Sequence, residues 1–293
     1  MSQRYRVSHR TTYTYDEDVN DSLGIAYLVP RDLAWQRVIE HDLVIDPSAS
    51  DHTVDLDYYA NTATYFQVTT SHRELDIVAT CLVEVDTPTY DQAGLAVPWE
   101  TAVPGGRPDV VDAWRAQDFA LASPLADHTA EAEAYAAESL TPGRELGEAV
   151  TDLMHRVNAD FSYDKTATTV TSTIDDIFDQ RAGVCQDFAH LMLACLRSHG
   201  LAARYVSGYL ATTPAPGKER VVGADATHAW LAVWMPDGGW LAVDPTNDHW
   251  VDDRYVTVAW GRDYGDVPPV KGVIFTEAKK SALKVEVDVA PSP

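Results

Sequence analysis

Polar and apolar residues alternate along four segments in the first third of the chain. These segments are residues 4–15, 38–46, 55–70 and 74–85, and they are rich in valine, tyrosine and threonine. Alternation with a period of two predicts β-strands that bury one face, because successive side chains of a strand point to opposite sides. Strands at this spacing are typical of an antiparallel sandwich. We therefore expect a sandwich-like, antiparallel N-terminal β-domain over residues 1–88.

The pattern changes after the last of these strands. Proline and glycine are concentrated in residues 89–108, which we interpret as a linker. Beyond the linker, apolar residues three to four positions apart predict helices at 110–120, 127–140 and 144–161. Helical segments followed by further strands indicate an α+β protein. The second domain is expected over residues 109–293, with a helical part and an antiparallel sheet.

Residues 181–200, RAGVCQDFAHLMLACLRSHG, carry the most informative pattern. Apolar residues recur at helical spacing after Cys185, and Gly200 stands where a helix commonly ends in a left-handed turn. Cys185 is therefore expected in the first turn of a buried helix, where unpaired N–H groups and the helix dipole favour a thiolate. His190 lies five residues further along the helix and points away from Cys185, so it is not expected to act as a base.

A thiolate nucleophile needs a base, and the base needs a partner that orients it. Residues 226–234 (ATHAWLAVW) alternate as a strand does, and a turn and a second strand-like segment, 241–248 (LAVDPTND), follow. A hairpin between them places His228 and Asp244 at similar heights on adjacent strands. The register stays open, with a bulge or a diagonal contact as the alternative. Cys185, His228 and Asp244 are thus the candidate nucleophile, base and orienting carboxylate.

These motifs resemble those of a known family. GVCQDFAHLM, ARYVSGYL, THAW and GWLAVDPT lie between residues 160 and 248 and look like the core of the bacterial transglutaminase-like cysteine enzymes, within the papain-like superfamily. The resemblance implies a papain-like fold for the second domain. It also implies the same three catalytic roles for Cys185, His228 and Asp244.

The resemblance extends to the N-terminal region, where YRVSHRTTYTYD, LVPRD and HRELDIVATCLVEV look like the family's separate β-domain. The family usually has a Gly-Asn pair in a turn of this domain, and this chain has Ala60-Asn61 instead. An aromatic pair like the family's precedes the cysteine helix and contains Tyr163. The Tyr163 hydroxyl fits either an oxyanion contact or packing, and packing is favoured. Gln186, next to the nucleophile, is a second candidate for an oxyanion or substrate contact.

Composition narrows the set of partners. The chain has 45 acidic residues against 22 lysines and arginines, for a formal net charge of −23 at pH 7. Nucleic acids and anionic membranes are bound by basic patches, so neither is expected as a partner. The acidity could attract cationic substrates such as lysine side chains or polyamines, although a solubilising surface explains it more simply.

Three cysteines and the absence of an apolar leader or a long apolar run predict a cytoplasmic protein without a disulfide framework. The sequence contains no HExxH, paired CxxC, P-loop or EF-hand motif, so neither a metal nor an organic cofactor is expected.

Together these features predict cysteine-dependent acyl transfer on peptide or carboxamide bonds through a thioester, the chemistry of a cysteine protease or amidase. The expected partner is a peptide or protein substrate. Two alternatives stay open. One is a protein-glutamine gamma-glutamyltransferase, which passes the acyl group to an amine acceptor. The other is a non-catalytic binding or scaffold module.

Overall fold

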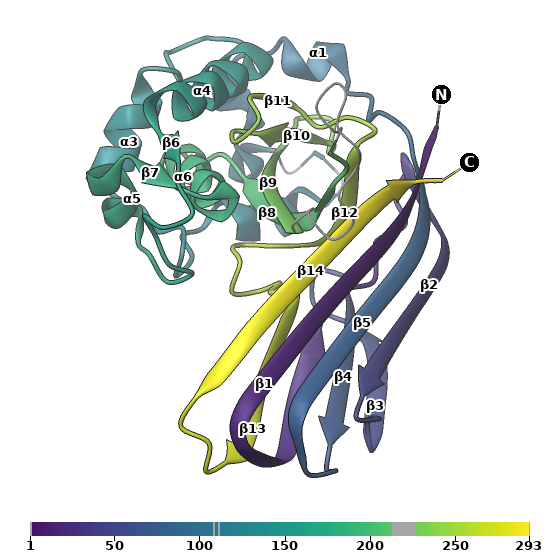
Figure 1. Ribbon diagram of the computed structural model, residues 1–293. Helices are drawn as coiled ribbons and strands as arrows, with labels where there is room; N and C mark the ends of the chain where they lie inside the picture. The colour runs from purple at the N-terminus through teal and green to yellow at the C-terminus, as the bar shows by residue number, and fades with distance from the viewer. Residues whose placement is uncertain (1, 108, 111, 213–226, 293) are drawn as a thin grey trace, which may run out of the picture.

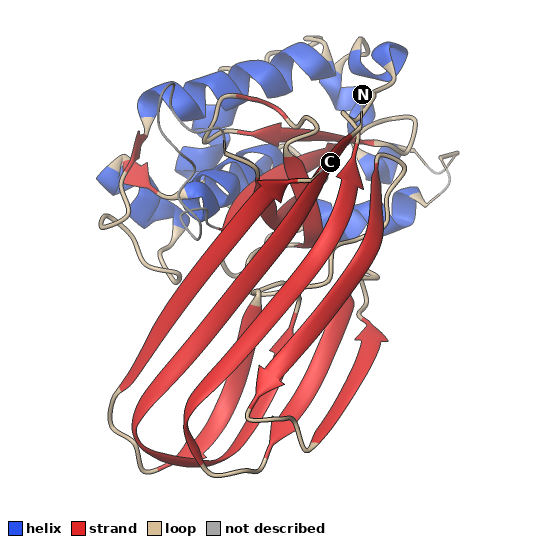
Figure 2. Cartoon of the chain, turned by 45° about the vertical axis from the view of Figure 1, so that its right-hand side comes forward, coloured by secondary structure: helices blue, strands red, loops and turns tan. Residues whose placement is uncertain are grey.

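The computed structural model describes residues 2–107, 109–110, 112–212 and 227–292. Within them, half of the strands form a long β-domain, and the helices gather around a second, shorter sheet (Figure 1, Figure 2). The expected α+β class is confirmed. Ala226, the first residue expected in the His228 strand, lies outside the described residues.

One antiparallel sheet of seven strands forms the β-domain. Its strands are β1 (Gln3–Ala26), β2 (Gln36–Asp46), β3 (Asp51–Leu56), β4 (Thr62–Val68), β5 (His72–Val85), β13 (Val270–Thr276) and β14 (Ser281–Pro291). β1 folds back on itself, so that residues 3–14 pair with β5 and residues 22–26 pair with β4. The two halves of the sheet face each other (Figure 1) and enclose an apolar core that includes Phe66, Leu75 and Ile77. One sheet thereby gains the sandwich-like form that the sequence predicts.

The last two strands of the chain also belong to this sheet. β14 runs antiparallel to the first half of β1, from Tyr15 opposite Ser281 to Tyr5 opposite Pro291, and β13 pairs with the second half. The sequence assigned all of 109–293 to the second domain, and that boundary is wrong for β13 and β14. Alternation identifies a strand but not its partner, and β1 offers a free edge to any strand that returns to it.

The second domain is built on a five-stranded antiparallel sheet in the order β11-β10-β9-β8-β12. Its strands are β8 (Ala203–Leu210), β9 (Thr227–Trp234), β10 (Trp240–Asp244), β11 (His249–Trp250) and β12 (Tyr255–Gly261). A small parallel pair, β6 (Ser162–Tyr163) with β7 (Ala182–Gly183), stands apart from it. The sheet carries the predicted His228 and Asp244 on the neighbouring strands β9 and β10.

Helices pack against both faces of this sheet. The α-helices are α1 (Gln92–Leu95), α2 (Ala113–Ala116), α3 (Ala130–Ala137), α4 (Leu146–Asp160), α5 (Ile174–Gln180) and α6 (Cys185–Ser198). Short 3₁₀ turns are η1 (Trp99–Ala102), η2 (Pro104–Gly106) and η3 (Gln117–Ala120). α6 packs against β8 and β9 on one face and is flanked by α3, α4 and α5, and the short α2 and η3 lie on the other face. The linker expected at 89–108 therefore contains short helical turns rather than irregular chain alone.

α6 is the central helix of the second domain, and its residues from Asp187 to Arg197 are all buried. Gly200 follows it with a φ of 79°, a backbone conformation that glycine adopts without strain. The Arg197 side chain donates hydrogen bonds to the backbone oxygens of Phe119 at 3.0 Å and Ala203 at 2.8 Å. The hydrogen bonds of Arg197 and the turn at Gly200 thus hold the C-terminal part of the helix that begins at Cys185.

Two side-chain amides of the β-domain join the domains. β12 is an edge strand of the second sheet, and an edge strand exposes unpaired backbone groups. Gln36 accepts a hydrogen bond from the Thr257 N–H and donates one to the Thr257 carbonyl, both at 2.8 Å. Asn61 does the same at Trp260, at 2.9 and 2.8 Å. The β-domain therefore covers this edge and fixes its own position against the second sheet.

Candidate active site

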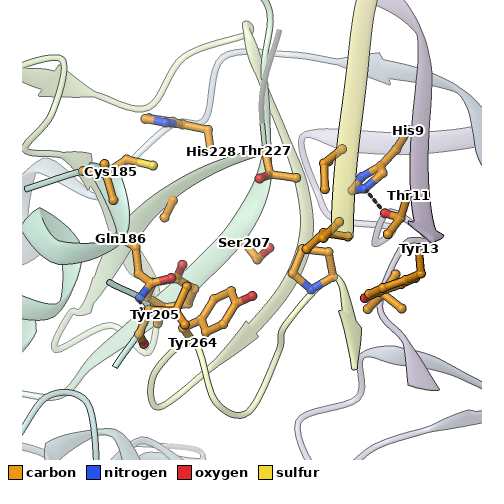
Figure 3. A pocket seen from close by; sticks show the side chains of 17 residues that line it. His9, Thr11, Tyr13, Cys185, Gln186, Tyr205, Ser207, Thr227, His228 and Tyr264 are labelled. Atoms are coloured by element: carbon orange, nitrogen blue, oxygen red, sulfur yellow. Dashed lines mark hydrogen bonds between the residues drawn. The ribbon is translucent and has the colours of Figure 1, made fainter. Parts of the chain in front are cut away.

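Cys185 is the first residue of α6, and its side chain is partly exposed in a cavity of about 260 Å³ (Figure 3). The preceding residue, Val184, has an extended backbone with a φ of −109°. The chain therefore enters the helix abruptly, and the first N–H groups of the helix have no partners within it. The sequence places Cys185 in the first turn of this helix, and the structure confirms that position.

Asp187 organises the start of the helix. Its Oδ2 accepts hydrogen bonds from the Val184 N–H at 2.7 Å and from the Thr168 hydroxyl at 2.6 Å. Burial raises the pKa of this carboxyl, and the two hydrogen bonds oppose that effect. A β-carbon on Gly183 would lie 2.7 Å from the same oxygen, so glycine is required for the close approach. Asp187 thus caps the helix that carries the cysteine.

His228 and Asp244 contact each other across β9 and β10. The Nε2 of His228 lies 2.6 Å from the Oδ2 of Asp244. The strands pair Val243 with Leu231, so Asp244 stands two residues out of step with His228 and reaches it diagonally. Of the arrangements left open by the sequence, the diagonal contact is the observed one.

The His228 ring has two further neighbours. The Asn247 side-chain amide nitrogen lies 3.3 Å from Nε2, and the Cys185 thiol helps raise the pKa of the ring. Since Nε2 faces Asp244, the ring presents Nδ1 to the sulfur. Figure 3 shows the Cys185 sulfur and the His228 ring close together at one end of the cavity. The structure therefore brings the three residues singled out in the sequence into one continuous chain of contacts.

Asp244 is fully buried among hydrogen-bond donors. Its Oδ2 accepts from the Tyr255 hydroxyl at 2.6 Å and from the Asn247 side-chain amide at 2.7 Å. Its Oδ1 accepts from the Thr246 N–H at 2.9 Å. Burial alone would raise the pKa of Asp244, but the hydrogen bonds and the neighbouring imidazole of His228 hold it below its usual value. The carboxylate stays ionised and held in place.

This carboxylate determines the charge of the histidine. Burial alone would lower the pKa of His228, but the hydrogen bonds with Asp244 and Cys185 outweigh it and raise the pKa to about 10. An imidazolium is therefore the favoured form at neutral pH. A positive ring beside a sulfur at a helix start stabilises a thiolate, so the pair is suited to nucleophilic attack.

Tyr255 and Asn247 were not singled out in the sequence. The contact of Asn247 with Asp244 is the easier of the two to infer from the sequence. Asn247 closely follows the strand of Asp244, and a side-chain amide after an Asp-Pro turn can fold back onto the aspartate. Tyr255 begins β12, which pairs with β8 rather than with β10. Nothing in local spacing signals such a contact.

The two candidates for oxyanion or substrate contacts lie in different environments. Gln186 lines the cavity, and its Nε2 donates to the Val170 carbonyl at 3.4 Å. Tyr163 on β6 is 51% exposed and is not among the described residues that line the cavity. Burial and the nearby charges of Cys185 and Asp187 raise its pKa. Gln186 is part of the cavity wall, whereas the oxyanion and substrate roles of both residues stay predictions.

The β-domain supplies the opposite wall of the cavity. His9, Thr11 and Tyr13 of β1 and Leu283 and Val285 of β14 line it (Figure 3). The Nε2 of His9 lies 3.0 Å from Thr11 Oγ1, and its Nδ1 lies 3.0 Å from the hydroxyl of Tyr209 on β8. Burial lowers the pKa of His9 to about 4, so the ring is neutral. This wall could not be foreseen, because it depends on how the two domains pack.

The remaining histidine and cysteines of interest have structural environments. The Nε2 of His190 accepts a hydrogen bond from the Tyr264 N–H at 3.1 Å, and burial lowers its pKa to about 3. Burial raises the pKa of Cys195 and of Cys81 to about 12. Neither thiol ionises at neutral pH. Cys185 is thus the thiol suited to reaction.

Among the described residues, no group of three His, Cys, Asp or Glu side chains is placed to hold a metal ion. In the same part of the chain, no helix is long and apolar enough to cross a membrane.

Two family models match the chain. The "Bacterial transglutaminase-like N-terminal region" covers residues 5–84, and the "Transglutaminase-like superfamily" covers residues 133–245. The first match falls in the β-domain. The second contains Cys185, His228 and Asp244.

Relatives cover the chain to different extents. The chain is 45% identical over 297 residues to "Uncharacterized protein Rv2569c" of Mycobacterium tuberculosis, which accounts for 99% of this chain and 93% of that protein. It is 40% identical over 101 residues to a Pseudomonas aeruginosa protein named "Protein-glutamine gamma-glutamyltransferase", which accounts for 33% of this chain and 15% of that protein.

A solved structure shares the fold over the whole chain. It is that of a Cytophaga hutchinsonii protein designated "a Putative Cysteine Protease", and it superposes with a TM-score of 0.71 at 15% identity. The match covers 99% of this chain and 98% of that one. The likeness therefore extends over both domains.

Proposed function

Because the chain belongs to the bacterial transglutaminase-like family, we propose that it is a cysteine-dependent enzyme that transfers acyl groups from peptide or carboxamide bonds through a thioester. The observation that carries the proposal is the position of one ring. His228 contacts a buried carboxylate, Asp244, at 2.6 Å, and the Cys185 thiol acts on the same ring and helps raise its pKa. The three groups are those that activate a thiol.

The first half-reaction forms the thioester. The Cys185 thiolate attacks the carbonyl carbon, a C–S bond forms, and the carbonyl oxygen takes the negative charge. The Cys185 backbone N–H at the start of α6 is one donor to this oxyanion. The His228 imidazolium then gives its proton to the leaving nitrogen, and the C–N bond breaks to release an amine or ammonia.

The second half-reaction restores the enzyme. His228, now neutral, takes a proton from the acceptor as the acceptor attacks the thioester carbonyl. The C–S bond breaks, the thiolate is regenerated, and the imidazolium again stands beside it. Water as the acceptor gives hydrolysis, and a primary amine gives a new amide. Asp244 holds the ring in one orientation throughout.

The cavity limits what reaches the sulfur. Its volume is about 260 Å³, and apolar side chains from both domains line much of it, among them Val170, Val270 and Val285. A cavity of this size admits a side chain or a short extended segment rather than a folded surface. We infer that the substrate enters between the domains and presents a single carboxamide or peptide group to Cys185.

Transamidation is the second candidate function. It is favoured by the Pseudomonas aeruginosa relative, named "Protein-glutamine gamma-glutamyltransferase", which matches 33% of this chain. The apolar walls of the cavity also favour transamidation, because they exclude water and so let an amine compete for the thioester. The formal net charge of −23 is compatible with a cationic amine acceptor.

One experiment tests both functions. The full-length protein is incubated with benzyloxycarbonyl-glutaminylglycine, with and without cadaverine, and ammonia release is followed together with the intact protein mass. A mass gain equal to the acyl group on Cys185 supports the thioester. Product bearing cadaverine supports transamidation, and free acid alone supports hydrolysis.

Two variants make the result specific. Cys185→Ala is expected to lose ammonia release and the mass gain, whereas Cys195→Ala, at the buried thiol of the same helix, is expected to keep both. A Cys185→Ala protein that still turns over would contradict the assignment. Wild-type protein that forms no acyl adduct with this substrate or with a peptide library would favour a non-catalytic binding module.

A further inference from the structure

A second cavity of about 480 Å³ lies at the junction of three parts of the molecule. Its walls come from the second sheet, from α2 and η3, and from the turn at residues 58–60 of the β-domain. It shares no described lining residue with the cavity at Cys185. Tyr205 on β8 lines the first cavity and its neighbour Arg204 lines the second, so the two lie on opposite faces of the sheet.

Arg204 is the unusual residue of this cavity. It is only 8% exposed, and its guanidinium carbon lies 3.6 Å from the ring centre of Trp260 and 4.2 Å from that of Trp240. Its buried Nε has no hydrogen-bond partner among the described residues. Within the same part of the chain, no carboxylate forms an ion pair with it, and the charge that acts on it most is that of another cation, Arg31.

Such an arrangement is costly for the protein alone. A buried cation loses the free energy of its hydration, and only a counter-charge or several hydrogen bonds compensate for that loss in full. The two indole rings recover part of this energy through cation–π contacts. Burial and the repulsion from Arg31 lower the pKa of Arg204 well below its usual value. An anion at the guanidinium edge would remove both penalties.

The charged neighbours do not supply that anion. Arg31 already donates to the Asn61 side chain at 2.6 Å. Two carboxylates line the cavity, and both are engaged elsewhere. Asp118 accepts from the Tyr58 hydroxyl at 2.7 Å, and Asp112 lies 3.7 Å from Arg115. Neither of the two carboxylates that line the cavity therefore serves as the counter-ion of Arg204.

The side chains that line the cavity indicate the chemistry of the rest of the ligand. Aromatic side chains line the cavity, namely Tyr58, Tyr59, Trp114, Phe119, Trp234, Trp240 and Trp260. Flat apolar groups stack on such walls, and the planar fork of an arginine fits a carboxylate through two hydrogen bonds. We propose that this cavity is a binding site for a carboxylate attached to a flat apolar group, with Arg204 as the counter-ion.

The first test compares two ligands that differ in one group. N-acetylphenylalanine carries the carboxylate and a flat side chain, and N-acetylphenylalaninamide lacks only the charge. Binding to the full-length protein is measured by isothermal titration calorimetry and by tryptophan fluorescence. We expect the acid to bind about ten-fold or more tightly than the amide, which corresponds to one charge-assisted contact. Equal affinities, or no binding of the acid, would overturn the proposal.

The second test locates the site. Protein alkylated at Cys185 should bind the acid as wild type does, and loss of binding there would place the ligand in the first cavity. Arg204→Gln should lose the preference for the acid, whereas Arg115→Gln, at a solvent-exposed arginine of the same cavity, should keep it. An Arg204→Gln protein that folds by circular dichroism and keeps the preference would refute the site.

A third variant covers the case in which Arg204→Gln does not fold. Trp114 is 66% exposed, so Trp114→Ala leaves the core intact. Losing this aromatic wall should weaken binding of the acid several-fold, since a stacking contact is removed. Unchanged affinity of the acid for Trp114→Ala would count against a ligand that stacks in this cavity.

Discussion

At the scale of single residues, the reactivity of the thiol is controlled through the carboxylate behind the histidine. Asp244 is fully buried and accepts hydrogen bonds from Tyr255 and Asn247 as well as contacting His228. Each donor keeps the carboxylate ionised and aimed at the ring. The charge state of His228 therefore depends on side chains that do not touch the substrate cavity.

The first prediction concerns pH. Asp244 helps raise the pKa of His228 to about 10 against the effect of burial, so the protonated ring persists until the pH rises through that value. The alkaline limb of kcat/KM should lie near it. Asp244→Asn removes the opposing charge, so burial should lower the pKa and move the limb down by more than about one pH unit. Asp248→Asn, at an exposed carboxylate, is the control.

That profile is measured on the glutamine dipeptide from about pH 6 to 11. An alkaline limb at the same pH in wild type and Asp244→Asn would show that the carboxylate does not set the charge of the ring.

The second prediction concerns Tyr255. Tyr255→Phe removes the hydroxyl that donates to Asp244 at 2.6 Å and leaves the ring in place. We expect kcat to fall about ten-fold, because the orientation of the His228–Asp244 pair loosens. The matched control is Tyr58→Phe, which removes a hydroxyl that donates to Asp118 at 2.7 Å on the surface.

Steady-state kinetics and thermal unfolding are measured on both variants. Equal losses of activity in Tyr255→Phe and Tyr58→Phe would count against this role. So would a kcat of Tyr255→Phe that equals that of wild type.

The turn of the β-domain offers a third prediction. Ala60 has a φ of 58°, a left-handed conformation that costs an alanine about 1–2 kcal/mol. Ala60→Gly should therefore raise the free energy of unfolding by about 1 kcal/mol, after the greater entropy of glycine in the unfolded chain is subtracted. Chemical denaturation measures it. A less stable variant would show that the methyl group contributes packing that outweighs the strain.

At the scale of secondary-structure elements, the position of Cys185 depends on how α6 begins. Gly183 lies against Asp187 so closely that a β-carbon there would stand 2.7 Å from the carboxylate. The fourth prediction is that Gly183→Ala displaces Asp187 from the Val184 N–H and costs about 1–3 kcal/mol of stability, with a loss of activity. Gly106→Ala is the control, since no described atom lies within 4 Å of the point that its β-carbon would occupy.

Denaturant unfolding and kcat are measured for both. A Gly183→Ala protein as stable and active as Gly106→Ala would mean that the helix start tolerates the shift.

The sequence predicted these elements unequally well, for physical reasons. The helix at Cys185 and the two strands of His228 and Asp244 follow from local periodicity and from turn residues, and both are observed. The diagonal contact between His228 and Asp244 could not be predicted from the sequence, because it depends on which residues pair across the hairpin. Tyr255 was missed because it arrives from a strand that is not a neighbour of β10.

At the scale of the whole molecule, the two domains are joined by hydrogen bonds that replace a missing strand. Gln36 is buried and makes two hydrogen bonds to the backbone of Thr257 and a third, at 2.7 Å, to the Arg31 carbonyl. Asn61 holds Trp260 in the same way. The wall that the β-domain contributes to the substrate cavity is therefore held in a fixed position.

The fifth prediction tests this joint. Gln36→Ala leaves the N–H of Thr257 buried without its acceptor and should cost about 2–4 kcal/mol of stability. KM should rise because the wall loosens. Gln67→Ala is the control, since its amide bonds Asp21 within the β-domain at 3.0 Å.

Denaturation and steady-state kinetics distinguish the outcomes. Equal stability and KM in the two variants would mean that the domains are held together by other contacts.

The fold of β1 has a consequence for how the protein is made. β1 is synthesised well before β13 and β14, with the whole second domain between them, so β1 keeps an unpaired edge during all the intervening translation. Domains are generally expected to fold in the order in which they are synthesised. Here the sheet that begins with β1 is completed only after the helices and the second sheet have been synthesised, so the cavity at Cys185 gains the part of its wall from β14 after the rest of the site exists.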